Sequence, residues 1–313
     1  MNLNEFELID IIRRSSAKAR GRLLLGIGDD CAVIGEKSGR SLLVTTDMLV
    51  EGVHFTSKHD PLLVGQKAML SNISDIAAMG GQPLYALISV GLKKEKAASY
   101  AFKLYRGLRS AAKKHKVGII GGDTVSSAKT VINITLLGET SGKKYIKRNG
   151  AKEGDFIVVT GTLGAGAAHL LNGKVYVPRL KVSFAQALAT AGLANAMIDV
   201  SDGLSSEIHH LAKESGLGAL IAKKSIPLSA FTLKTAQRKK KDAFLLALNG
   251  GEDYELLFTM SPKKLRLVLK LAVEFGIKAS VLGVMLPKKM GVNISDLDNR
   301  LYPLKREGFD HFI

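Results

Sequence analysis

The chain has 313 residues, of which 45 are basic and 28 acidic, so its formal net charge is +17. A single cysteine, Cys31, excludes a disulfide-stapled scaffold and a zinc site built on several thiolates, and it favours a reducing, cytoplasmic location. With 46% apolar residues the composition is that of a globular protein, long enough for about two domains.

The sequence does not predict a membrane protein. Its longest uncharged stretch, Val182 to Ile198, is interrupted by polar residues. It is also shorter than the roughly 20 apolar residues that a membrane span needs. The acidic N-terminus lacks the pattern of a signal peptide.

Hydrophobic periodicity predicts an α/β unit in the first half of the chain. We expect helices over residues 3–16, 62–79 and 94–114. We expect strands over residues 22–25, 41–46, 84–92, 117–120 and 131–140. The polar, glycine-containing segment 141–154 is expected to separate two domains, which we place at residues 1–145 and 146–313.

The second half repeats this organisation. Strands are expected over residues 156–160, 219–222, 243–248, 255–260 and 280–285. Helices are expected over residues 165–171, 183–191, 203–214 and 262–275, the last with Ser261 as its cap and Pro262 in its first turn. The predicted fold class is therefore α/β (α+β) in two domains of similar size, the first with a mixed sheet and helices.

Common catalytic and nucleotide-binding motifs are missing. Neither Gly-Lys pair belongs to a P-loop, and the chain has no protein-kinase motif set, no H-E-x-x-H and no G-x-S-x-G. The glycine-rich turn Gly161–Gly166 follows an expected strand and opens an expected helix, so it is a candidate anion-binding turn. Tight packing of a strand against a helix would explain the same glycines.

Acidic residues recur beside glycines at the ends of apolar runs. The segments are Gly26–Asp30, Thr45–Asp47, Asn72–Gly81, Gly121–Thr124, Asp199–Gly203 and Gly250–Tyr254. Any one of these carboxylates could cap a helix. Several that converge in a cleft repel one another unless cations neutralise them. Oxygen ligands with few histidines favour magnesium, manganese or calcium over zinc, and magnesium commonly binds together with phosphates, so we predict a magnesium–nucleotide ligand.

Seven motifs in this order resemble those of the thiamine-monophosphate kinase family, within the superfamily of aminoimidazole ribonucleotide synthetase. They are GIGDD, TTDMLVEGVHF, SNISDIAAMGGQP, GGDT, DVSDGL, GGEDYELLF and GFDHF, and they extend from Gly26 to Phe312. The resemblance implies a homodimer formed through the N-terminal sheets and a C-terminal α/β domain that closes a cleft for ATP. It also implies ATP-dependent phosphorylation of thiamine monophosphate to thiamine diphosphate by direct in-line transfer, assisted by several Mg²⁺ ions.

The resemblance assigns roles to individual residues. The implied metal ligands are Asp30, Thr45, Thr46, Asp47, Asp75, Asp123, Asp199 and Asp202, of which Asp47, Asp75, Asp123 and Asp202 are also expected to be catalytic. The implied ATP contacts are Tyr105, Gly121, Gly122, Arg148 and Ser201. The implied thiamine-phosphate contacts are His54, Glu252 and Phe309, the last at a position where the family often has tryptophan.

Other functions stay open at this stage. Another ATP-using member of the superfamily, similar to aminoimidazole ribonucleotide synthetase, is the nearest alternative, and a non-catalytic binder is a further one. The charge of +17 also allows a nucleic-acid partner, which a carboxylate-lined cleft disfavours, so we do not expect one. Cys31 precedes Ala32 in an apolar run, unlike the reactive cysteine of selenophosphate synthetase. We expect free thiamine to be rejected, since its lack of a phosphate would leave cationic groups of the site unpaired.

Overall fold

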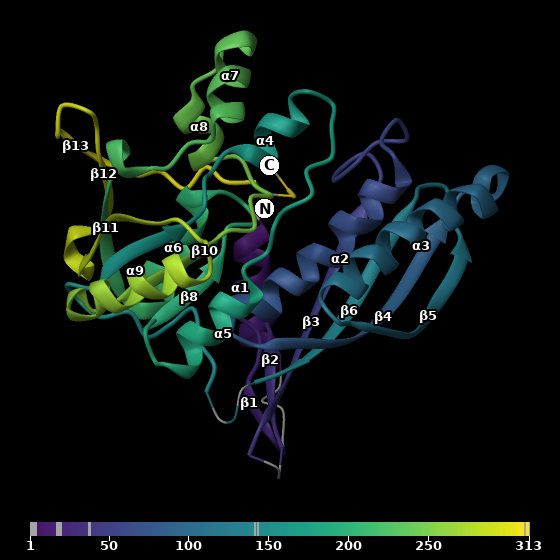
Figure 1. The fold of residues 1–313 in the computed structure, drawn as a ribbon, viewed down its shortest axis with the longest axis horizontal. Coiled ribbons are helices and arrows are strands. Elements are labelled where there is room, and N and C mark those ends of the chain that lie inside the picture. Colours follow the sequence, from purple (N-terminus) through teal and green to yellow (C-terminus); the bar gives the residue numbers. More distant parts are fainter. Residues whose placement is uncertain are drawn as a thin grey trace.

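The computed structural model describes residues 5–16, 21–36, 39–140, 142, 144–309 and 311–312. Two α/β domains lie side by side, the N-terminal one in purple to blue and the C-terminal one in green to yellow (Figure 1). Glu5 and His311, from opposite ends of the described chain, lie in contact, since the backbone N–H of His311 donates to the Glu5 carboxylate at 3.3 Å. The predicted α/β fold class is confirmed.

The N-terminal domain contains a mixed sheet of six strands. Their bounds are β1 Leu23–Leu25, β2 Ala32–Gly35, β3 Ser41–Val50, β4 Gln82–Leu92, β5 Gly118–Ser126 and β6 Val131–Glu139. They lie in the order β1-β2-β3-β6-β4-β5, and only β4 and β5 are parallel. Helices α2 (Pro61–Ala78) and α3 (Ala97–Lys114) cover one face of this sheet (Figure 1).

The other face of the N-terminal sheet carries exposed apolar side chains. On β4, Ala86 and Ile88 are buried against the helices, whereas Tyr85 and Leu87 alternate with them and are exposed. On strands β3, β4 and β5 the exposed apolar residues are Met48, Tyr85, Leu87, Ile120 and Val125. A sheet face of this kind is typical of a surface that another protein covers.

Helix α2 is the central helix of the N-terminal domain. It begins at the cap Asp60, whose carboxylate accepts from the backbone N–H of Leu62 at 3.0 Å. It is buried on most sides because it contacts the sheet, α3 and the C-terminal domain. The crossing with α3 is close: a Cβ on Gly107 would lie 1.9 Å from the Leu62 carbonyl oxygen.

The C-terminal domain contains a sheet of seven strands in the order β13-β12-β9-β11-β7-β10-β8. Their bounds are β7 Phe156–Thr160, β8 Ala196–Asp199, β9 Leu217–Ala222, β10 Leu256–Met260, β11 Ala279–Pro287, β12 Val292–Ser295 and β13 Leu301–Pro303. The helices are α4 Ala165–Leu170, α5 Val182–Thr190, α6 Leu204–Ser215, α7 Ala230–Lys239, α8 Ala243–Leu248 and α9 Leu265–Glu274. Short 3₁₀ turns occupy Lys94–Lys96, Lys223–Ser225, Pro262–Lys264 and Lys288–Met290.

Strands β7, β8 and β10 of the C-terminal sheet are buried on both faces. Val158 of β7 joins the core that contains α5 and α9, while its neighbours Ile157 and Val159 join the core that contains α6 and α8. The first core continues without a break into the N-terminal domain. At this junction Gly80 lies against α5, where a Cβ would come within 2.5 Å of the Ala189 methyl group. The two domains are therefore packed directly against each other.

Most predicted elements are confirmed within a few residues, but the strand expected over residues 243–248 is wrong. This segment is α8, whose cap Asp242 accepts from the backbone N–H of Phe244 at 2.7 Å. Its alanine and leucine residues favour a helix. The prediction failed because a short apolar run without clear periodicity fits a strand and a helix equally well. Periodicity also missed the short strands β2, β8, β12 and β13 and the polar helix α7. The Ser261 side chain makes no capping hydrogen bond.

Helix α1 (Glu5–Ser15) extends the N-terminal domain onto the C-terminal one. Its Arg13 pairs with Glu214 of α6 at 3.2 Å, and its Asp10 pairs with Lys213 at 2.7 Å. None of the helices in the described part of the chain is long and apolar enough to cross a membrane. The domain bounds 1–145 and 146–313 stay a prediction.

Candidate active site

A cavity of about 630 Å³ lies between the two domains. Its walls come from the turn before β2, from β3 and α2, from the loops around α6 and α8, and from the C-terminal segment. Eleven of the predicted site residues line it: Asp30, Thr45, Thr46, Asp47, His54, Asp75, Arg148, Ser201, Asp202, Glu252 and Phe309.

The free edge of β3 forms one wall of the cavity. Strand β2 pairs with β3 only as far as Val44, so the edge that follows is open to the cavity. The Thr45 hydroxyl donates to Asp75 of α2 at 2.6 Å, and the backbone N–H of Asp47 donates to the Asn72 side chain at 3.1 Å. These two contacts hold the strand edge against the helix.

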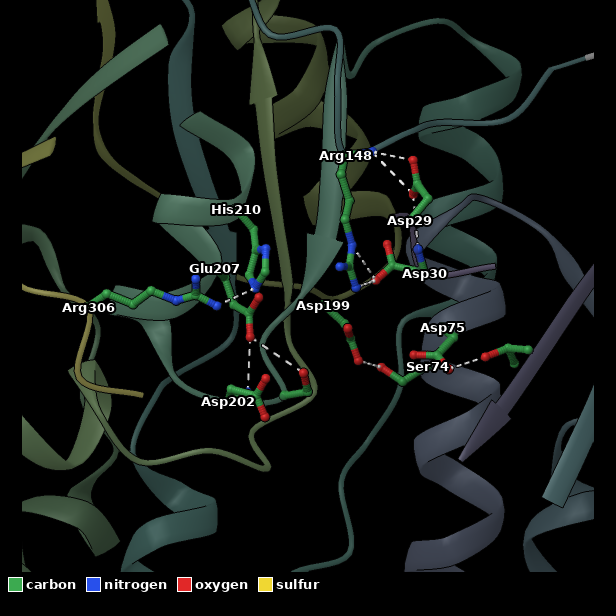
Figure 2. Close-up of polar contacts among 12 residues, drawn as sticks. Asp29, Asp30, Ser74, Asp75, Arg148, Asp199, Asp202, Glu207, His210 and Arg306 are labelled. Atoms are coloured by element: carbon green, nitrogen blue, oxygen red, sulfur yellow. Dashed lines mark hydrogen bonds and ion pairs between the residues drawn. The ribbon is translucent and has the colours of Figure 1, made fainter. Parts of the chain in front are cut away.

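Three carboxylates, of which those of Asp30 and Asp199 are buried and that of Asp75 is partly buried, lie close together beside the cavity (Figure 2). Asp30 follows β1, Asp75 lies on α2 and Asp199 ends β8, and one oxygen from each lies within 4.8 Å of the others. The Ser74 hydroxyl donates to Asp199 at 2.5 Å and thereby joins α2 to the C-terminal domain. The sequence predicted all three as metal ligands, although Asp199 does not itself line the cavity.

The charge in this cluster is only partly balanced. Burial, together with the charges of Asp47 and Asp199, raises the pKa of Asp75 well above its usual range. Burial and the charge of Asp30 raise the pKa of Asp199 to about 7. Oxygen Oδ2 of Asp30 is buried and has no hydrogen-bond partner among the described residues. Carboxylates that repel one another, one of them with a buried oxygen that has no hydrogen-bond partner, fit a hard divalent cation such as Mg²⁺.

Arg148 connects this cluster to the interdomain segment. Its guanidinium donates to Asp30 through Nε at 3.1 Å and through Nη2 at 2.5 Å. Its backbone N–H donates to the Asp29 carboxylate at 3.1 Å. Burial and the charge of Asp30 raise the pKa of Asp29 to about 7. No role for Asp29 was predicted from the sequence, although its place beside Asp30 in GIGDD pointed to one.

The loop before α6 carries Ser201 and Asp202 to the cavity. Glu207 of α6 is buried behind this loop and accepts from the backbone N–H of Asp202 at 3.0 Å and from the Ser201 hydroxyl at 3.4 Å (Figure 2). Burial, with the charge of nearby Glu5, raises the pKa of Asp202 to about 7. Sequence reasoning missed Glu207 because an acidic residue in the first turn of a helix is common.

The opposite end of the cavity contains aromatic rings and a second carboxylate. The His54 ring lies 5.1 Å from the His311 ring and 6.4 Å from the Phe309 ring, measured between centroids. Nδ1 of His54 accepts from the backbone N–H of Val50 at 3.0 Å, and burial lowers the pKa of His54 to about 4. The imidazole is therefore neutral at pH 7. The carboxylate is that of Glu252, which pairs with the buried Lys67 of α2. The sequence analysis singled out neither His311 nor Lys67.

Besides Asp199, four predicted residues do not line this cavity. Asp123, Gly121 and Gly122 belong to β5, at the far edge of the N-terminal sheet, and Tyr105 lies on α3. Three strand spacings separate β5 from β3, about 14 Å. Gly122 is also required by the sheet itself, because its φ is +153° and a Cβ there would lie 1.7 Å from the Ile88 carbonyl oxygen.

The candidate anion-binding turn at Gly161–Gly166 already holds an anion of the protein. The backbone N–H groups of Gly164 and Gly166 donate to the Asp253 carboxylate at 2.6 and 3.0 Å. This contact fixes the loop that presents the neighbouring Glu252 to the cavity. The glycine turn therefore binds a carboxylate of the protein and holds the loop that carries Glu252.

Comparisons with known proteins place the chain in a family. Residues 28–140 match the family described as AIR synthase related protein, N-terminal domain, and residues 152–294 match the corresponding C-terminal domain. The thiamine-monophosphate kinase of Buchnera aphidicola subsp. Schizaphis graminum is 34% identical over 100% of both chains. That of Aquifex aeolicus is 38% identical over 82% of this chain and 86% of its own. The chain belongs to the thiamine-monophosphate kinase family.

A solved structure agrees with the family assignment. The structure titled "AaThiL complexed with AMPPCP and TMP" is 32% identical to this chain and superposes with a TM-score of 0.85. The match covers 98% of this chain and 97% of that one. The resemblance found in the seven sequence motifs is thereby confirmed at the level of family and fold.

Proposed function

We propose that the protein phosphorylates thiamine monophosphate to thiamine diphosphate with ATP as phosphoryl donor, in the cavity between its domains. The observation that carries the proposal is the arrangement of that cavity. A carboxylate cluster suited to Mg²⁺ occupies one end, and a neutral histidine, a phenylalanine and a carboxylate occupy the other. The relatives' names and the solved complex with AMPPCP and TMP support the same assignment.

The carboxylate end is proposed to hold the triphosphate through metal ions. The central ligands would be the carboxylates of Asp30, Asp75 and Asp199. Oxygen Oδ2 of Asp30 accepts no hydrogen bond from the described residues, so it could bind a cation without losing one. The remaining proposed ligands are Thr45, Thr46, Asp47 and Asp202. Magnesium, when bound, screens the repulsion between two polyanions and stabilises charge on the transferring phosphoryl group.

The aromatic end is proposed to bind the thiamine moiety. The exposed ring of Phe309 offers a flat face, and its backbone N–H donates to the Asp202 carbonyl at 3.0 Å, which ties it to the metal end. Because His54 is neutral, its ring adds no repulsion to the cationic thiazolium. The Glu252 carboxylate is suited to accept a hydrogen bond from the aminopyrimidine.

A second copy of the chain is proposed to complete the ATP site. The apolar, exposed face of the N-terminal sheet supports a homodimer through that face. Tyr105, Gly121, Gly122 and Asp123 lie outside the cavity of their own chain but belong to this sheet and its adjoining helix. In a two-fold dimer they would approach the edge of β3 in the partner. At this edge Thr46 and Met48 line the cavity, and Met48 is also exposed on the apolar face of the sheet.

The proposed chemistry is direct transfer. A phosphate oxygen of thiamine monophosphate attacks the γ-phosphorus of ATP in line, a new P–O bond forms, and the bond to the ADP oxygen breaks. The nucleophile is already an anion, so no strong general base is needed. Arg148, Ser201 and the metal-binding carboxylates would align the two phosphates, and alignment and electrostatics would provide most of the rate.

A coupled assay tests the function. ATP and Mg²⁺ are offered with thiamine monophosphate, with free thiamine, or with the ribonucleotide substrate of the aminoimidazole-forming alternative. We expect thiamine diphosphate from the monophosphate only. Turnover of the ribonucleotide without turnover of thiamine monophosphate would transfer the function to the related synthetase.

A further inference from the structure

We infer that Lys67 is a positioning residue for the thiamine-binding end of the cavity and sets the affinity for thiamine monophosphate through Glu252 and the His54 backbone. This inference deepens the proposed function and rests on it. Lys67 carries none of the site roles described above, and it does not line the cavity.

The position of Lys67 is unusual for a lysine. Its side chain is only 3% exposed and points from the middle of α2 toward the C-terminal domain. Burial of an ammonium group costs free energy unless charged and polar partners compensate it. A lysine at this position therefore needs a reason beyond the packing of the helix.

The partners of Lys67 are two of the proposed thiamine contacts. Nζ donates to Oε1 of Glu252 and to the backbone carbonyl of His54 at 2.9 Å. These residues come from different domains, since His54 follows β3 and Glu252 lies between α8 and β10. One buried cation thus fixes both groups relative to each other.

The Glu252 carboxylate is shared between Lys67 and the cavity. Its side chain is 25% exposed and lines the cavity, and no described residue donates to its second oxygen, Oε2. With Oε1 held by Lys67, Oε2 is free to accept from a ligand. A carboxylate whose rotamer is already fixed loses less conformational entropy when the ligand binds.

The backbone at Glu252 also needs external support. Its φ is +71°, a left-handed conformation that costs free energy for a residue with a side chain. Its N–H donates to the Ser201 carbonyl at 2.7 Å, and the adjacent Asp253 is held by the glycine turn. Lys67 provides the contact that fixes the side chain itself.

The test is a steady-state comparison of Lys67→Met with the wild type in thiamine monophosphate and in ATP. Loss of an orienting contact of this kind is expected to raise KM for thiamine monophosphate about tenfold or more, with KM for ATP changed less than about twofold. Lys93→Met is the matched control, because Lys93 forms an ion pair with Glu51 at 2.7 Å in the same domain but away from the cavity. We expect this control to leave both KM values unchanged.

A double-mutant cycle separates positioning from general stability. If Lys67 acts through Glu252, then KM for thiamine monophosphate in Lys67→Met/Glu252→Gln should be similar to that of the more affected single variant. The inference would be wrong if the factors by which the two single substitutions raise KM multiplied in the double variant. It would also be wrong if Lys67→Met raised KM for thiamine monophosphate and KM for ATP equally. Should Lys67→Met fail to fold, Lys67→Gln replaces it, because the amide is uncharged, its side chain is one atom shorter, and it cannot form the ion pair that orients Glu252. An unchanged KM for thiamine monophosphate in that variant would also overturn the inference.

The same assay distinguishes the two levels of the proposal. A wild type that does not phosphorylate thiamine monophosphate removes the proposed function. A wild type that does so, with Lys67→Met indistinguishable from it, removes only the role of Lys67.

Discussion

The guanidinium of Arg148 and the carboxylate of Asp30 form a partly buried ion pair across the domain junction, with Nη2 2.5 Å from Oδ1 (Figure 2). The Asp30 side chain is fully buried, and the pair uses only one of its two oxygens. The Asp30 carboxylate also belongs to the cluster with Asp75 and Asp199. Arg148 thus compensates part of the negative charge and leaves an oxygen for a cation.

Removal of Arg148 should destabilise the fold. We expect Arg148→Met to lower the free energy of unfolding by about 3–5 kcal/mol, because it leaves a buried carboxylate without its cation. Urea denaturation measures this. Arg40→Met, which breaks an exposed pair with Glu139 at 2.7 Å, should cost less than about 1 kcal/mol. Equal losses for the two variants would show that the pair with Asp30 has no special role.

Neutralising Asp75 should lower the activity of the enzyme and raise the stability of its metal-free form. We expect Asp75→Asn to reduce kcat/KM about 10²–10³-fold by analogy with the loss of one preorganised group. In metal-free buffer it should raise the melting temperature by about 2–4 °C per kcal/mol of relieved repulsion. Thermal unfolding with and without Mg²⁺ measures this. The surface variant Glu139→Gln should change neither quantity, and an Asp75→Asn protein with wild-type kcat/KM would contradict the proposed ligand set.

The pH dependence at His54 has a definite sign. Because burial lowers its pKa to about 4 from the usual 6.5, the unfolded chain binds a proton between these values and the folded protein does not. The contribution of His54 to stability is therefore present above about pH 6.5 and is lost as the pH falls toward 4. NMR titration of the imidazole, assigned with His54→Gln, should give a midpoint near 4. A midpoint near 6.5 would show that the ring is not desolvated.

A shared active site predicts complementation between inactive variants. Asp47→Asn and Asp123→Asn should each be inactive alone. Mixed after reversible dissociation, they should recover about one quarter of wild-type activity, since half of the dimers then contain one intact site of two. A mixture as inactive as its components would place both aspartates in a site formed by one chain. Sedimentation of Leu87→Arg, expected to be monomeric, provides the control for assembly.

The close crossing of α2 and α3 predicts an exception to helix propensity. Alanine is favoured over glycine in a helix by about 1 kcal/mol. Gly107→Ala should nevertheless destabilise the protein by about 2 kcal/mol or more, because its Cβ would overlap the Leu62 carbonyl. Lys103→Ala on the same helix is the control and should be nearly neutral. Chemical denaturation of both compares the two sites directly.

Local sequence was sufficient for much of this protein. Periodicity located the long elements because their apolar residues follow one face, as in α3 and β6. The motifs around Asp30, Asp75 and Asp202 identified the carboxylate set, since such residues recur beside glycines at the ends of apolar runs. Periodicity failed at α8, where six apolar and helix-favouring residues follow a capping aspartate.

Tertiary structure decided which of these residues meet. Asp30, Asp75 and Asp199 are far apart in the sequence, and their distances depend on how two domains pack through α2 and α5. Lys67 was invisible to sequence reasoning because a lysine in a helix is usually solvated, and only its burial against Glu252 shows otherwise. Asp123 carries the same motif chemistry as the others, yet strand order places it about 14 Å from β3. Composition and spacing determine the chemical groups that the chain offers, whereas domain packing and strand order determine their distances and solvation, on which their charge and reactivity depend.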